Sequence, residues 1–288
     1  MANVIGTITG AFDAYSENWR KVVVPFAVLV AIGFVFWLVT LGISLVSEGV
    51  CKVADDPYVL IAFCYFPQVI EWISGIVQEL VGLIVIMAVL VPLWEIANRK
   101  PMSSWTEHAG RQLFNALKVI VVRLGLSLVI FSPLIIFIAL NIAGIIAVVE
   151  SVPADADQVI VITALVGSLG MVVAAIILSI VLGMFLNFFL TFFEIEVAVG
   201  GKGIVEAVQS SANMVLANFL DTLVFNILWW AIGMSVSILV LFLFCTVCLI
   251  PVAFLFSPLV VVPIMWLSKL LLWKEFGGGS EKGIKRRL

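Results

Sequence analysis

The chain has 288 residues, of which 64% are hydrophobic and 11% are charged, and its formal net charge is −3. A water-soluble domain usually carries about 25% charged residues, so this composition excludes a soluble protein and makes lipid the solvent of most side chains. The polar stretches between the apolar runs are too short to bury a hydrophobic core, which also excludes an added soluble domain.

Six apolar stretches are long enough to cross a bilayer, since a transmembrane helix needs about 20 mainly apolar residues. In chain order they cover residues 22–46, 69–94, 124–149, 159–193, 219–249 and 251–273. They predict an all-α polytopic membrane protein with one six-span domain over residues 1–276 and a flexible basic tail over residues 277–288. Asp13 and Glu17 precede the first apolar run, unlike the basic start of a signal peptide, so we expect the first span to be retained.

Positive charge lies on alternate sides of these spans. All of the 15 Lys and Arg residues except Lys52 lie before the first span, between the second and third, between the fourth and fifth, or at and beyond the end of the sixth. Cytoplasmic loops hold an excess of Lys and Arg. The sequence therefore predicts a multi-pass protein of the plasma membrane with both termini in the cytoplasm.

Three segments before the first, third and fifth spans share a polar spacing of i, i+3, i+4 and i+7, which places four polar groups on one helix face. The sets are Asp13, Ser16, Glu17 and Arg20; His108, Arg111, Gln112 and Asn115; and Glu206, Gln209, Ser210 and Asn213. The pattern predicts three interfacial amphipathic helices with these stripes facing cytoplasm and headgroups. It also indicates a threefold repeat of one such helix plus two spans, the alternative being chance amphipathicity of basic loops. The second helix should begin at the capping box Ser104 to Glu107.

All four cysteines fall on the predicted outer side, in the first outer loop and where the fifth span leaves the membrane. They are Cys51, Cys64, Cys245 and Cys248. That compartment permits disulfides, and we expect a structural bridge, most simply Cys51 with Cys64, or inert thiols. A redox role for the Cys-x-x-Cys pair is disfavoured because it ends a helix, where the helix dipole opposes a thiolate.

A few polar side chains lie deep in the apolar spans, where burial is costly and a functional role is the default hypothesis. The candidates are Glu79, Gln78, Asn141, Asn187 and Asn226. Glu79 is the chief one, because it is a carboxyl at a depth where no other span carries Lys or Arg. It either serves a proton relay or substrate site in a water-filled pocket, or is a neutral carboxyl bonded to one of these amides.

The fourth stretch, residues 159–193, would reach about 52 Å as a straight helix, against a hydrocarbon core of about 30 Å. It must tilt, protrude or break, and glycines such as Gly170 offer break points. Ala175, Ser179 and Gly183 form a small-residue stripe that predicts close helix packing.

The sequence Phe-Ser-Pro-Leu occurs twice, around Pro133 and Pro258, and the last span adds Pro251 and Pro263. Because proline removes a helical hydrogen bond, both helices should kink.

Residue types needed for common chemistry are scarce. His108 is the single histidine, and no HExxH, GxSxG or phosphate-binding loop is present. We therefore expect no catalytic residues, no metal site, no cofactor and no nucleic-acid partner.

The segment Phe192–Phe219, FFEIEVAVGGKGIVEAVQSSANMVLANF, carries an acidic residue and glycines before a helix of the form E-A-x-x-x-S. Glu206, Ala207 and Ser210 or Ser211 fit that form. The segment resembles the six-span membrane domain fused to some bacterial glycerophosphodiester phosphodiesterases, which also occurs as stand-alone archaeal membrane proteins. Because no phosphodiesterase domain accompanies it in this sequence, the resemblance does not imply that activity.

Together these features predict a non-enzymatic membrane protein that acts as an accessory, scaffold or lipid-interacting component, or as a subunit of a larger assembly. Its partners would be membrane lipids and either another membrane protein or a second copy of the chain. The alternative is a small transporter or permease subunit that uses Glu79 and the proline-kinked helices. A continuous polar cavity touching Glu79 would favour transport, and a dry, close-packed centre would favour the scaffold.

Overall fold

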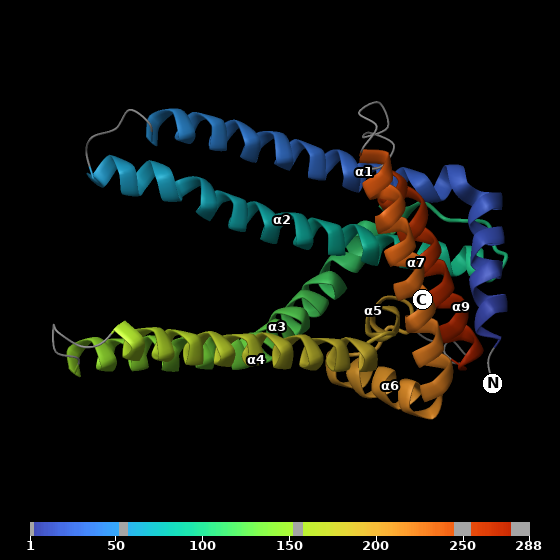
Figure 1. Cartoon of the computed structure of the whole chain (residues 1–288). Coiled ribbons are helices and arrows are strands. Elements are labelled where there is room, and N and C mark those ends of the chain that lie inside the picture. The colour runs from blue at the N-terminus through green and yellow to red at the C-terminus, as the bar shows by residue number, and fades with distance from the viewer. Residues whose placement is uncertain (1–2, 52–56, 152–157, 245–254, 278–288) are drawn as a thin grey trace. The chain divides into compact units, whose positions relative to one another are not determined.

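The computed structural model describes residues 3–51, 57–151, 158–244 and 255–277, and its regular structure within them is helical. The elements are α1 (Val4–Cys51), α2 (Pro57–Ala97), α3 (Trp105–Ser151), α4 (Gln158–Phe189), α5 (Phe193–Ala198), α6 (Ile204–Ala217), α7 (Phe219–Phe244), the π-helical turn η2 (Ser257–Val261) and α9 (Val262–Glu275) (Figure 1). Among these described residues, six helical segments are long and apolar enough to cross a membrane. The prediction of an all-α fold with six such segments is therefore confirmed.

Several helices are much longer than a bilayer is thick. The 48 residues of α1 correspond to about 72 Å and the 47 residues of α3 to about 70 Å, against about 30 Å of hydrocarbon. The first two polar stripes lie in the N-terminal parts of these helices, each of which continues into its span, so separate interfacial helices are not confirmed there. The reason is local: neither Gly nor Pro stands between stripe and span to end either helix.

The third polar stripe does form a helix of its own, α6. The glycines at 200, 201 and 203 precede it, and Asn218 ends it with the non-helical backbone angles φ −126° and ψ 43°. The predicted start of α3 is also met, because the helix begins at Trp105, directly after Ser104. The Ser104 hydroxyl, however, bonds the hydroxyl of Thr106 at 2.7 Å.

Contacts group the chain into two units, Met1–Ile120 with Phe192–Leu288, and Val121–Thr191. In the first unit α1 and α2 run side by side, and α9 packs against both (Figure 1). The core of this unit lies between the C-terminal half of α2 and α9, where Met87, Leu90, Leu93, Leu267 and Leu270 are fully buried. Polar contacts also join the start of α1 to the end of α9, where Glu275 accepts hydrogen bonds from the Asn3 backbone N–H and the Thr7 hydroxyl.

Beside the prolines of the last span, where the sequence predicted a kink, the chain forms the π-helical turn η2. Pro263 has no N–H, so the carbonyl of Leu259 loses its donor four residues on. The Tyr15 hydroxyl of α1 donates to this carbonyl at 2.8 Å. A tertiary contact thus satisfies the group that proline frees.

The second unit contains residues 121–151 of α3 and the whole of α4. The helix α4 runs unbroken from Gln158 to Phe189 through its glycines, so the suggested break is not found. Ala175, Ser179 and Gly183 are buried, and a Cβ atom at Gly183 would lie 3.4 Å from Ile130 of α3. The small-residue stripe therefore contacts α3 at Gly183; the sequence predicted close packing but not the partner helix.

Some predictions concern residues for which the structure gives no side-chain description. Cys245, Cys248 and the tail beyond Gly277 lie outside the described residues. The side chains of Cys51, Cys64 and Asn141 also lie outside them. The disulfide prediction therefore stays a prediction.

Candidate functional site

The short helix α5 carries a buried carboxylate at one end of the first unit. Five of its six residues are buried, and Glu196 among them is only 1% exposed. A carboxylate in such a place is very costly unless it is paired and hydrogen-bonded. Its partners therefore define the most constrained polar site of the described residues.

Three side chains from three different segments converge on Glu196. Its Oε1 accepts hydrogen bonds from Ser210 Oγ of α6 at 2.9 Å and from Trp273 Nε1 of α9 at 3.1 Å. Its Oε2 lies 2.8 Å from the Nζ of Lys202, in the loop between α5 and α6. Lys202 Nζ also donates to Ser210 Oγ. The carboxylate therefore ties α5, α6 and α9 together.

The loop between α5 and α6 depends on glycine to reach this carboxylate. A Cβ atom at Gly200 would lie 2.6 Å from the Glu196 carbonyl oxygen and 2.9 Å from Oε2, and Gly201 has φ +62°. Side chains are excluded from the first position by clash and disfavoured at the second by backbone strain. The glycines let the chain fold back so that the Lys202 backbone N–H donates to the Glu196 carbonyl at 3.1 Å.

A second set of polar contacts attaches α3 and α6 to the same region. Gln112 Nε2 donates to the Ala198 carbonyl at 3.0 Å, and the Phe192 N–H donates to Ser211 Oγ at 3.2 Å. Gln112 is 8% exposed, which contradicts the prediction for this one residue of its polar stripe. The hydrogen bond to α5 is the reason for its inward orientation, since a buried amide needs such a partner.

The arrangement of Ser210, Lys202 and Glu196 superficially resembles a serine nucleophile with a lysine base. A lysine that serves as a base must first be neutral, whereas an ammonium has three donors and no acceptor. Here Lys202 donates to Ser210 and pairs with Glu196, while Ser210 donates to the same carboxylate. The geometry suits a structural clamp between helix ends.

The polar residues predicted from the apolar spans do not form this site. The Glu79 side chain is exposed on the surface of α2. Hydrogen bonds described for the amides run along their own helices: Gln78 to Ser74 at 3.4 Å, Asn187 to the Gly183 carbonyl at 2.9 Å and Asn226 to the Thr222 carbonyl at 2.9 Å.

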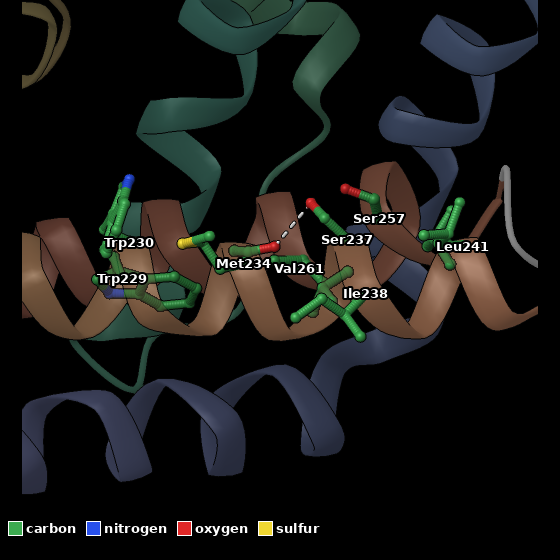
Figure 2. A pocket seen from close by; sticks show the side chains of 11 residues that line it. Trp229, Trp230, Met234, Ser237, Ile238, Leu241, Ser257 and Val261 are labelled. Atoms are coloured by element: carbon green, nitrogen blue, oxygen red, sulfur yellow. Dashed lines mark hydrogen bonds between the residues drawn. The ribbon is translucent and has the colours of Figure 1, made fainter.

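A large groove lies beside α7 and is closed on one side by η2 (Figure 2). Its volume is about 870 Å³, and its wall consists of indoles, aliphatic side chains, Met234 and the hydroxyls of Ser237 and Ser257. Ser237 Oγ already donates to the Gly233 carbonyl at 2.9 Å. No charged residue belongs to the described wall. Such a wall suits a hydrocarbon chain or an apolar side chain, because it offers little for a polar ligand to bind.

The sequence reasoning missed Glu196 as a site residue. The signal was present, because an acidic residue within the apolar run FFEIEVAV is followed by the glycine-rich GGKG, whose lysine can return to it. Its partner Trp273 lies 77 residues away along the chain, and that pairing has no local signature.

No family model matches this chain, and no curated protein and no solved structure matches it either.

Proposed function

We propose that this chain is a non-enzymatic integral membrane protein that acts as an accessory, scaffold or lipid-interacting component of a membrane assembly. The observation that carries the proposal is the Glu196 cluster, which uses its charged and polar atoms to hold α5, α6 and α9 to each other. A satisfied buried polar network makes the helices that it joins rigid, which suits a membrane scaffold.

The apolar surface of the spans supports lipid or helix contact as the second part of this function. On α1, Phe34, Trp37 and Leu45 are each more than half exposed. In a membrane such side chains lie against acyl chains or against an apolar helix, either from elsewhere in this chain or from a partner. The groove beside α7 adds a hollowed apolar surface of the same character.

The location and topology belong to the same proposal. Exposed Arg20 and Lys21 lie inside α1 just before its apolar run, Arg99 and Lys100 follow the end of α2, and Lys274 lies near the end of α9, so all mark the same predicted end of the spans. By the excess of positive charge in cytoplasmic segments, we assign this end and both termini to the cytoplasmic face of the plasma membrane. The interfacial role of the three polar stripes, the threefold repeat and the resemblance to the phosphodiesterase-linked membrane domain are parts of the proposal that rest on sequence alone.

The transporter alternative has less support in the described residues. Glu79 lines neither the groove beside α7 nor the smaller groove at Lys21. The amide side chains at 78, 187 and 226 donate to groups on their own helices. A coupled transport route would need polar groups that meet in a shared, water-filled space.

Reconstitution distinguishes the two functions. Purified protein is placed in vesicles of phosphatidylcholine with phosphatidylglycerol. The decay of an imposed proton or potassium gradient is then followed with a pH or potential dye. The same measurement is made on the variant Glu79→Gln. The scaffold proposal expects the gradient to decay as in protein-free vesicles for parent and variant alike. Faster decay with the parent that returns to the protein-free rate in Glu79→Gln would instead establish the coupled transporter.

A further inference from the structure

A second, smaller groove lies where the first span begins. It has a volume of about 330 Å³ and is lined by Lys21 and Val24 of α1 and by Met102, Ser103, Ser104 and Trp105 from the α2–α3 connection and the start of α3. All six residues belong to the first unit. The groove therefore combines one cation, two hydroxyls and three apolar side chains.

The wall from the α2–α3 connection is fixed by its own hydrogen bonds. Arg99 takes a left-handed conformation with φ 55°, and the Lys100 N–H donates to the Glu95 carbonyl at 2.8 Å, which ends α2 tightly. The Glu95 carboxylate accepts the Ser103 N–H at 2.6 Å, and Ser103 Oγ bonds His108 Nε2 at 2.8 Å. Because these hydrogen bonds already order the wall, a ligand that binds there loses little free energy to ordering it.

Lys21 carries the one charge among the six lining residues, and it is positive. Its side chain is exposed, and the ion pair found among the described residues is that of Lys202 with Glu196. None of the six lining residues is acidic. The Glu95 carboxylate accepts the Ser103 N–H and keeps its charge, but it does not line the groove. The Lys21 ammonium is thus available to an anion.

The position of the groove selects the kind of anion. Lys21 directly precedes the apolar run that starts at Val22, and Val24, half exposed, continues the wall toward the hydrocarbon. A lysine at the start of a span lies at headgroup level, and the indole of Trp105 suits the same level. A ligand in this groove would be charged at one end and apolar at the other.

We propose that this groove binds the headgroup of an anionic phospholipid, with its phosphate at Lys21 Nζ and the Ser104 side of the loop, and with the glycerol and first acyl carbons against Val24 and Met102. The proposal deepens the lipid-interacting function and rests on it. A soluble phosphate would leave the apolar half of the wall unused, so we assign the lipid.

The test measures lipid retention by native mass spectrometry of the full-length protein in neutral detergent, titrated with phosphatidylglycerol or phosphatidylcholine. Lys21→Gln should weaken phosphatidylglycerol binding about fivefold, the factor of about one charge at a lipid surface, and leave phosphatidylcholine binding unchanged. Lys274→Gln, which removes an exposed lysine near the end of α9, is the matched control and should change neither lipid by as much as twofold. Equal losses in both variants would mean general surface attraction and would overturn the assigned groove.

A second variant separates lipid from soluble phosphate. Val24→Ser keeps the cation and should weaken phosphatidylglycerol binding, whereas millimolar inorganic phosphate should compete poorly with the lipid in the parent. Efficient competition by phosphate, with no effect of Val24→Ser, would mean a soluble-anion site and would refute the lipid assignment. If only the groove assignment is wrong, the parent protein should still retain phosphatidylglycerol. A parent protein that retains no lipid would contradict the lipid-interacting function itself.

Discussion

The Glu196 cluster makes a quantitative prediction about stability. Glu196→Ala removes the acceptor of Ser210 and of Trp273 Nε1, and also removes the anion paired with Lys202. Trp273 is 1% exposed, so its indole N–H cannot turn to water. Removing one partner of a buried ion pair typically costs about 3–5 kcal/mol.

The loss of stability in Glu196→Ala should lie at the lower end of this range of about 3–5 kcal/mol. Lys202 remains 29% exposed, so water can solvate part of the ammonium once its partner is gone. We therefore expect Glu196→Ala to lower the free energy of unfolding by about 3 kcal/mol. Glu196→Gln keeps an acceptor oxygen for Ser210 and Trp273 but loses the charge, and it should cost about half as much. Ser210→Ala removes two hydrogen bonds, the one donated to Glu196 and the one accepted from Lys202, and should cost about 2 kcal/mol.

The assay is reversible unfolding in mixed micelles by titration with sodium dodecyl sulfate, followed by far-ultraviolet circular dichroism. Glu206→Gln, an exposed acid of α6, is the control and should stay within about 0.5 kcal/mol of the parent. The reasoning is refuted if Glu196→Ala unfolds within about 1 kcal/mol of the parent, or if the Ala and Gln variants are equally destabilised.

Two further predictions use the same titration. Tyr15→Phe should lower the free energy of unfolding by about 1 kcal/mol, because the Leu259 carbonyl loses its hydrogen-bond donor. The loss should be smaller in a Pro263→Ala background, where a backbone N–H becomes available to that carbonyl. An equal loss in both backgrounds would contradict the assigned role of proline. Gly183→Leu should lower the free energy of unfolding by about 1–3 kcal/mol, because the new side chain overpacks against α3. Gly170→Leu is the control and should leave the stability unchanged, since nothing lies within 4 Å of its Cβ position. Similar costs at both positions would contradict the contact of α4 with α3.

The sequence by itself was sufficient for the features that depend on neighbouring residues. The six spans follow from hydropathy over windows of span length, because solvation by lipid acts on each segment separately. The start of α3 after Ser104 was also readable from neighbouring residues, although the Ser104 hydroxyl bonds Thr106. The small-residue stripe on α4 was also readable, since its spacing fixes one helix face.

Tertiary structure decided which polar groups matter. Glu79 was singled out for its depth in the sequence, yet it lies exposed on α2, whereas Glu196 is buried with partners from α6 and α9. Gln112 was assigned to a water-facing stripe and instead turns inward to α5. The physical reason is that desolvation and hydrogen bonding depend on what packs against a side chain, and those neighbours come from segments far apart in the chain.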